Sequence, residues 1–223
     1  MSKNILIVGA SGLVGGEILK NLKTTNNDLI LLSRKKLICE NSINQIVIDF
    51  ENIDSLDASL KVDEIYIAIG QKLSLSELVY IKKNNRKSFV NVDYNYIKKV
   101  AEFAKKCGAS SIGLISAIGA NSKSFNTYLK VKGDVEQEIK LVGYKKIIIA
   151  HPSHLLGKRA EEDIPMNVKV FEQITNLFGL LMIGPLQKFR NVEAKKVAKA
   201  IISKMDSVEE GIHYIDYKYF KNF

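Results

Sequence analysis

The chain has 223 residues, of which 46% are hydrophobic and 26% are charged. This balance is typical of a globular protein in water and excludes disordered and fibrous chains. A chain of this length buries roughly 70–75% of the surface that its unfolded form exposes, which is enough for one sizeable core without disulfides or metal staples. We therefore expect a single domain over residues 1–223.

The net charge of +9 does not by itself indicate a nucleic-acid partner. The basic residues form scattered doublets, no Trp is present, and no aromatic residues are interleaved with the basic ones, so the sequence favours a solvated surface and no nucleic-acid partner. Cys39 and Cys107 lack CxxC spacing, so we expect reduced thiols and no metal site.

The sequence contains no stretch of about 20 apolar residues that could cross a bilayer. Met1–Asn4 leads straight into the apolar run Ile5–Val8, without the hydrophobic segment of a signal peptide. We therefore expect a cytoplasmic protein that does not bind membranes.

Short apolar runs alternate with segments of helical periodicity. Ile5–Val8 is an unbroken aliphatic run that ends at Gly9, which is typical of a strand buried on both faces. The remaining predicted strands are 29–32, 46–48, 65–69, 112–115 and 147–150. Two predicted helices are marked by their apolar faces, the first by Val14, Ile18 and Leu22 and the second by Tyr94, Ile97, Ala101 and Ala104. Two further helices are predicted over 127–141 and 192–204. Six strands alternating with helices predict an α/β fold, a Rossmann-type doubly wound parallel sheet with helices on both faces.

The alternation loosens after Pro152. The spacing of apolar residues predicts an amphipathic helix over 171–181, followed by the apolar stretch 180–185. That stretch either covers a pocket, packs on a partner subunit or joins the core, and core packing is the favoured of the three. We expect residues 151–191 to form a small irregular region beside the substrate.

A glycine-rich segment joins the first strand to the first helix. In Gly9-Ala10-Ser11-Gly12-Leu13-Val14-Gly15, the glycines recur every three residues. Gly9 permits a sharp turn, Gly12 lets the backbone approach a pyrophosphate, and Gly15 lets the helix lie close to the sheet. Free amides and the helix dipole then attract phosphate, so the segment favours dinucleotide binding over a purely structural turn.

The residues after the second and third strands bear on the choice of cofactor. Where an acidic side chain would bind the ribose 2′-hydroxyl of NAD, the chain has Ser33 and Arg34. The guanidinium of Arg34 matches a phosphate, which favours NADP(H) over NAD(H), although an ordinary surface charge is the alternative. Asp49 follows the third strand and either accepts from the adenine amino group or starts a turn.

A serine, a tyrosine and a lysine lie further along the chain. Ser116 follows the fifth strand, and Tyr128 stands four residues before Lys132 on the next helix. Four residues make about one helical turn, so the phenol and the ammonium share a face. A neighbouring cation lowers the pKa of a tyrosine, which suits acid–base catalysis, and Ser116 would hydrogen-bond the substrate oxygen. The alternative is a half-buried Tyr beside a solvent-facing Lys.

Several segments together resemble a known family. They are GASGLVG at Gly9, Val92-Asp93 opening a helix, LISAIGA around Ser116, YLKVKGDVEQEI from Tyr128 and LLGKRAE from Leu155. The chain resembles the short-chain dehydrogenase/reductases, and within them the atypical branch that includes the Tat-interacting protein. The resemblance implies a Rossmann-type fold that binds NADP(H), with Ser116, Tyr128 and Lys132 in the catalytic positions.

The resemblance extends to the cofactor-binding residues, with several departures, among them Ala117 where such motifs commonly have a second serine. Relatives have Arg-Pro-Gly where this chain has His151-Pro152-Ser153, and we expect His151 and His154 to be polar pocket lining and not metal ligands. Gly70 and Gln71 should border the cofactor. The full expected set is Gly9, Ser11, Gly12, Leu13, Val14, Gly15, Ser33, Arg34, Asp49, Phe50, Ala68, Ile69, Gly70, Lys132 and Pro152.

Three functions fit these residues. The first is an NADP-dependent oxidoreductase that transfers hydride between the cofactor and a small carbonyl or alcohol substrate, for which a homodimer is one option. The second is a nucleotide-sensing regulator with little turnover. The third is a nucleotide-sugar epimerase, which is disfavoured because about seventy C-terminal residues leave little room for a sugar-nucleotide lobe.

Overall fold

The computed structural model describes residues 2–39, 43–157 and 184–223. Its main sheet has seven parallel strands in the order β3-β2-β1-β4-β5-β6-β9. This is the Rossmann order, so the predicted α/β doubly wound fold is confirmed. The strands of this sheet are β1 (Asn4–Val8), β2 (Asp28–Ser33), β3 (Asn44–Val47), β4 (Glu64–Ile67), β5 (Ser111–Ile115), β6 (Lys146–Ala150) and β9 (Gly211–Ile215).

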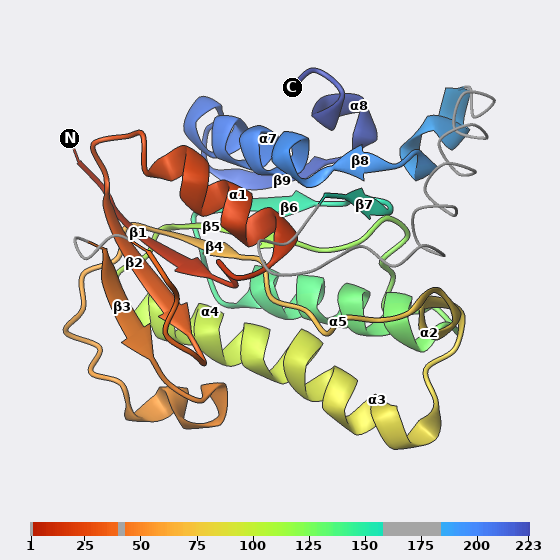
Figure 1. Cartoon of the computed structure of the whole chain (residues 1–223), viewed down its shortest axis with the longest axis horizontal. Coiled ribbons are helices and arrows are strands. Elements are labelled where there is room, and N and C mark those ends of the chain that lie inside the picture. The colour runs from red at the N-terminus through yellow and green to blue at the C-terminus, as the bar shows by residue number, and fades with distance from the viewer. Residues whose placement is uncertain (1, 40–42, 158–183) are drawn as a thin grey trace.

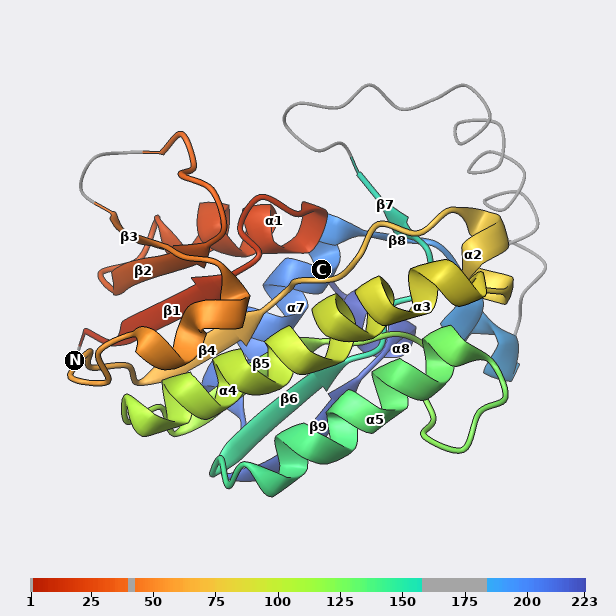
Figure 2. The same ribbon diagram turned by 90° about the horizontal axis from the view of Figure 1, so that it is seen from below.

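Helices cover both faces of the sheet (Figures 1 and 2). On one face lie α1 (Leu13–Leu22) and α7 (Ala194–Ser207); on the other lie α3 (Lys83–Val90), α4 (Ile97–Lys106) and α5 (Thr127–Leu141). The central strands β1, β5 and β6 are almost wholly buried, which explains their largely apolar sequences. The remaining elements are the short helices α2 (Leu75–Val79) and α8 (Tyr217–Phe220), the 3-10 turns Phe50–Ser55 and Gly184–Phe189, the π-helical turn Asn91–Tyr96, and the strand pair β7 (Leu155–Leu156) and β8 (Val192–Glu193).

The structure differs from the sequence prediction mainly near the C-terminus. The seventh strand, β9, was not predicted, because Ile212 and Tyr214 are about half exposed on this edge strand and are separated by polar His213. The predicted helix 192–204 begins two residues later, after β8. The helix predicted over 171–181 and most of the apolar stretch 180–185 lie outside the described residues.

The turn between β1 and α1 depends on two glycines. Gly9 has φ +93°, and a Cβ there would lie 2.6 Å from the carbonyl oxygen of Ala68. A Cβ on Gly15 would lie only 2.1 Å from the carbonyl oxygen of Gly9. Because both obstacles are backbone atoms, which cannot rotate away, these glycines allow β1, β4 and α1 to approach one another closely.

The variant Gly15→Ala should therefore be less stable by about 1–3 kcal/mol, the usual cost of overpacking. Gly16→Ala is the matched control on the same helix, since its Cβ would lie 3.2 Å from the carbonyl oxygen of Ala10, a contact that a small shift relieves. Urea unfolding of both variants measures the difference. Equal free energies of unfolding for the two variants would show that α1 does not pack as closely against the carbonyl of Gly9 as the structure indicates.

Candidate active site

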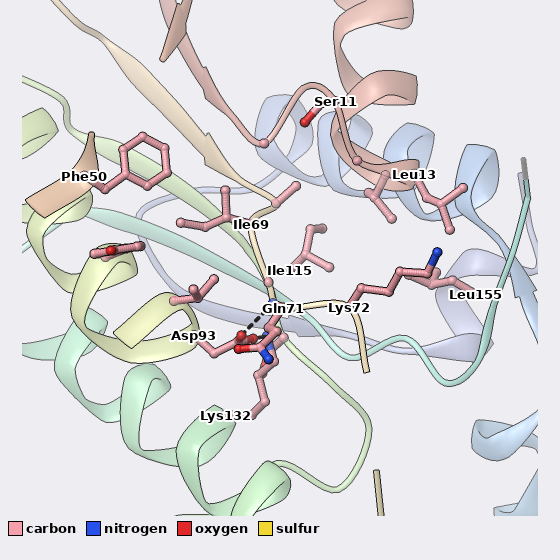
Figure 3. A pocket seen from close by; sticks show the side chains of 18 of the residues that line it. Ser11, Leu13, Phe50, Ile69, Gln71, Lys72, Asp93, Ile115, Lys132 and Leu155 are labelled. Atoms are coloured by element: carbon pink, nitrogen blue, oxygen red, sulfur yellow. Dashed lines mark hydrogen bonds and ion pairs between the residues drawn. The ribbon is translucent and has the colours of Figure 1, made fainter. Parts of the chain in front are cut away.

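A cleft of about 550 Å³ opens where the strand order reverses between β1 and β4 (Figure 3). This is the position at which doubly wound sheets bind ligands. The volume falls within the range of small-molecule and cofactor sites. The cleft is lined by Gly9, Ser11, Gly12, Leu13, Val14, Arg34, Phe50, Ala68, Ile69, Gly70, Gln71, Lys72, Ser88, Val92, Asp93, Tyr96, Ile115, Ser116, Tyr128, Lys132 and Leu155.

One end of the cleft contains the N-terminus of α1. Gly12 caps this helix with extended backbone geometry, no side chain caps it, and its first turn carries no acidic residue. The first-turn amides therefore lack side-chain partners, and the positive end of the helix dipole lies beside Gly12 and Leu13 in the cleft wall. This arrangement suits the diphosphate of a dinucleotide.

The neighbouring part of the cleft carries aromatic and basic side chains. Phe50 and Tyr96 meet edge to face, with ring centroids 5.6 Å apart. Arg34 is exposed and lines the same part of the cleft. The rings offer an apolar surface for an adenine, and the guanidinium offers a planar pair of donors for a phosphate.

Four residues expected against the cofactor do not line the cleft. Ser33 donates its hydroxyl hydrogen to the carbonyl of Lys35, and Asp49 caps the 3-10 turn by accepting from the amide of Glu51, so the turn-starting alternative for Asp49 is the one that the structure has. Gly15 serves packing, as described above. Pro152 is buried, and its carbonyl accepts from the amide of Ile118.

Helix α5 presents three functional side chains at intervals of one turn. Asn126 caps the helix by accepting from the amide of Leu129, which fixes where the helix begins. Tyr128, Lys132 and Glu136 then follow at i, i+4 and i+8 and share one face of the helix. Lys132 and Glu136 are buried, which rules out the alternative of a solvent-facing lysine.

The ammonium of Lys132 forms a buried ion pair with Asp93. The distance between Lys132 Nζ and Asp93 Oδ1 is 2.8 Å, and the two side chains are 7% and 2% exposed (Figure 3). The other carboxylate oxygen, Oδ2, accepts from the amide of Gln71 at 2.7 Å. Asp93 lies in the π-helical turn between α3 and α4, a feature often found at functional sites. Asp93 thus joins the lysine to the segment after β4.

The pKa of Tyr128 is raised, not lowered as the sequence analysis expected. Burial of the phenol is the largest cause, and the charge of Asp93 adds to it, while Lys132 acts in the opposite direction. For Lys132, burial opposes the charge, but Asp93 and Tyr128 outweigh it and raise the pKa. At neutral pH the site therefore holds a protonated phenol beside a charged ammonium.

Ser116 contacts a carboxylate that the sequence analysis did not single out. Its hydroxyl donates to Glu136 Oε1, and the same oxygen lies 2.8 Å from Nε2 of His151. Ser116 also lines the cleft. His151 and His154, expected as pocket lining, are not among the cleft-lining residues. In the structure the hydroxyl hydrogen of Ser116 points to Glu136, and the hydrogen bond from Ser116 to a substrate oxygen stays a prediction.

The structure brings together Ser116, Tyr128, Lys132 and most of the expected cofactor-lining residues in one cleft. Asp93 and Glu136 were missed as site residues. A signal existed for Glu136, because it lies one turn beyond Lys132 on the same helical face. Within the described residues, no group of three His, Cys, Asp or Glu side chains is placed to hold a metal ion.

No model of a known protein family matches the chain. HTATIP2 of Rattus norvegicus is 32% identical over 167 residues, which cover 72% of this chain and 66%, about two thirds, of the rat protein. FMP52 of Lodderomyces elongisporus is 30% identical over 178 residues, covering 72% of this chain and 70% of the yeast protein. The chain belongs to the HTATIP2 and FMP52 family, an atypical branch of the short-chain dehydrogenase/reductases.

Solved structures support the fold of this HTATIP2 and FMP52 family member. MoeE5 in complex with UDP-glucose and NAD has a TM-score of 0.69 at 11% identity, with 97% of this chain and 79% of MoeE5 covered. A short-chain dehydrogenase family protein of Francisella tularensis has a TM-score of 0.67 at 16% identity, with coverage of 99% and 100%. At such identities the likeness shows the Rossmann fold alone.

The relatives correct one expectation. The yeast FMP52 proteins of the family are named as mitochondrial, which contradicts the cytoplasmic location expected from the start of the sequence. Among the described helices, none is long and apolar enough to span a membrane.

Proposed function

We propose that the protein is an NADP(H)-dependent oxidoreductase that transfers hydride between the cofactor and a small carbonyl or alcohol substrate. The observation that carries this proposal is the continuity of the cleft. A single cleft is lined by the uncapped N-terminus of α1 at Gly12 and by the pair Tyr128 and Lys132. A nicotinamide dinucleotide is long enough to join an anion site to an acid–base site of this kind, and MoeE5 was solved with NAD on the same fold.

The residues in the cleft fit such a cofactor. The positive φ of Gly9 and the close packing of the turn keep side chains away from the phosphates. The amides that begin α1 would hold the diphosphate, Phe50 and Tyr96 would flank the adenine, and Arg34 would bind a 2′-phosphate. When bound, the nicotinamide supplies or accepts the hydride.

The chain's own residues would manage the proton. Because the pKa of Tyr128 is raised, its phenol is protonated at neutral pH and is suited to donate to a carbonyl oxygen as that oxygen gains charge. The ammonium of Lys132 would then stabilise the phenolate that remains. Asp93 holds that ammonium at 2.8 Å and also fixes the amide of Gln71, so it is a positioning residue. These features favour carbonyl reduction.

The direct test is a screen of small aldehydes and ketones with the purified protein and NADPH. We expect at least one class of carbonyl compound to cause oxidation of NADPH. The oxidation is monitored as the loss of the near-ultraviolet absorbance of NADPH. Tight NADPH binding without turnover across a broad panel would contradict the proposal and would favour a nucleotide-sensing role.

The choice of cofactor gives a second test. Arg34→Ala should weaken NADPH binding by about 10-fold or more, the value of one charge-assisted hydrogen bond to phosphate, and should leave NADH binding nearly unchanged. Lys35→Ala is the matched control, because Lys35 is a neighbouring exposed cation that does not line the cleft. Calorimetric titration of both variants with both cofactors gives the four affinities. Equal loss for NADPH and NADH would refute the role in 2′-phosphate binding.

A further inference from the structure

A buried carboxylate, that of Glu136, contacts Ser116. The side chain of Glu136 is only 6% exposed, and its Oε1 atom receives two contacts, one from the hydroxyl of Ser116 and one from Nε2 of His151 at 2.8 Å. A carboxylate held between a hydroxyl and an imidazole joins three groups that can each carry a proton. Ser116, Glu136 and His151 therefore form a hydrogen-bonded row that connects a cleft-lining residue to an imidazole.

The far end of this row reaches the surface of the molecule. The side chain of His151 is 19% exposed, and its ring packs against Tyr214 of β9 with centroids 5.4 Å apart. Tyr214 is itself about half exposed, and the ammonium of Lys140 of α5 lies over its ring, 5.6 Å from the ring centroid. The imidazole thus has access to water beside the edge strand, whereas Glu136 and Ser116 are buried.

Lys132 is poorly suited to carry the proton itself. Its ammonium is buried against Asp93, and its raised pKa keeps it charged. A lysine in this state acts as a fixed charge and not as a group that alternately gains and loses a proton. Glu136 interacts electrostatically with Lys132 on the same helix, and it contacts the imidazole of His151, which lies in the segment after β6. Among the residues that the structure describes, the titratable groups in contact with His151 are Glu136 and Tyr214.

We propose that Ser116, Glu136 and His151 form the route by which the active site exchanges its proton with solvent. This inference rests on the proposed reductase function. In reduction, the carbonyl carbon would accept the hydride that a bound nicotinamide supplies, the C=O π pair would move onto oxygen, and Tyr128 would give its proton to that oxygen. Ser116 then gives its hydroxyl proton to the phenolate, directly or through one water. Ser116 regains a proton from Glu136, Glu136 from His151, and His151 from solvent, so one solvent proton is consumed per turnover.

The same row runs outward in alcohol oxidation, with every transfer reversed. In that direction the oxygen of Ser116 accepts a proton from the cleft, while the hydroxyl hydrogen of Ser116 passes to Glu136. The hydrogen bond in the structure already runs from Ser116 to Glu136. The two nitrogens of an imidazole can each bind or release a proton, so the ring can carry a proton between a buried carboxylate and water.

The kinetic test compares two variants that interrupt the row at different points. His151→Ala should lower kcat by about 10-fold or more, within the usual range for an acid–base group, and added imidazole should restore much of the loss by occupying the vacated space. Glu136→Gln keeps the shape of the side chain but cannot accept a proton, so we expect a similar loss of kcat that imidazole does not restore. NADPH affinity should stay within about twofold in both variants, since neither residue lines the cleft.

Two controls accompany these variants. His213→Ala removes another histidine, on β9, whose ring contacts the carbonyl of Glu209 and which does not line the cleft, and it should leave kcat unchanged. His151→Phe keeps an aromatic ring against Tyr214, so it provides a folded variant without a proton carrier if the alanine variant fails to fold. Its kcat should be as low as that of His151→Ala, without rescue.

A readout without cofactor tests the contact itself. The chain has three histidines, so the ring signals of His151 can be assigned in the NMR spectrum of the ligand-free protein by their loss in His151→Ala. Glu136→Gln should shift the ring signals of His151 and leave those of His213 in place. Unchanged signals of His151 would overturn the proposal, because the imidazole would not be bonded to Glu136.

The possible failures are distinguishable. If the wild-type protein oxidises no NADPH with any carbonyl, the proposed function fails and the proton route fails with it. If the wild type turns over but His151→Ala stays within about twofold of its kcat, the proton route alone is wrong. A loss of kcat that imidazole restores in neither His151→Ala nor Glu136→Gln would also overturn it, because the residues would then only position Ser116.

Discussion

Tyr128→Phe should lower the rate of NADPH-dependent carbonyl reduction by about 100-fold or more, the usual contribution of a general acid, while the affinity for NADPH stays within about twofold. The change removes only the hydroxyl, and the ring keeps its tilted contact with Phe89, 6.0 Å between centroids. In the proposed function the dinucleotide is bound by α1 and the aromatic end of the cleft, which the change does not touch. Steady-state kinetics and calorimetric titration separate the two effects.

The matched control is Tyr94→Phe, because Tyr94 is partly buried in the π-helical turn but does not line the cleft. It should retain full turnover. The pH profile adds a further check on Tyr128. Because its pKa is raised, the reduction rate should stay high through neutral pH and fall only when alkaline conditions remove the phenolic proton. A rate that depends on a deprotonated phenol, rising with pH through the neutral range, would contradict the assigned role.

The second large effect concerns the buried ion pair. Asp93→Asn leaves the ammonium of Lys132 buried without a counter-charge, and we expect a loss of about 3–5 kcal/mol in the free energy of unfolding. The double variant with Lys132→Met removes the buried charge as well and should recover much of that loss. Urea unfolding at neutral pH, where the lysine is charged, measures all three proteins.

An exposed ion pair provides the control for that comparison. Lys98 and Glu138 lie 2.9 Å apart with side chains 37% and 28% exposed, so Glu138→Gln should cost no more than about 1 kcal/mol. In Asp93→Asn the pKa of Tyr128 should also fall, because the negative charge that helps to raise it is gone. The alkaline limb of the activity profile would then move to lower pH. Equal stabilities of Asp93→Asn and Glu138→Gln would show that Lys132 is not held as a buried cation.

The central sheet could be predicted from the sequence because its strands are buried on both faces. Such strands carry aliphatic runs, as in Ile5–Val8, and that run is followed by a helix with clear periodicity. The edge strand β9 escaped prediction for the opposite reason. One of its faces meets solvent, so Ile212 and Tyr214 alternate with other residues in a segment of five, which is a weak signal.

The candidate site was predicted where it depends on neighbours in sequence and missed where it depends on distant ones. The glycine turn and the spacing of Tyr128 and Lys132 are local, and the structure places both at the cleft. Asp93 lies 39 residues before Lys132, and a π-helical turn shifts its direction relative to an ordinary helix. The predicted direction of the pKa shift of Tyr128 was therefore wrong. The local sequence shows the neighbouring lysine, but it shows neither the burial of the phenol nor the carboxylate of Asp93 that opposes the lysine.

A crystal structure of the protein soaked with NADPH tests the central claim most directly. We expect the diphosphate to lie on the first-turn amides of α1 after Gly12, the 2′-phosphate to contact Arg34, and the nicotinamide ring to lie beside the hydroxyl of Tyr128. Density for the dinucleotide in another place, or in this cleft with the nicotinamide turned away from Tyr128, would contradict it.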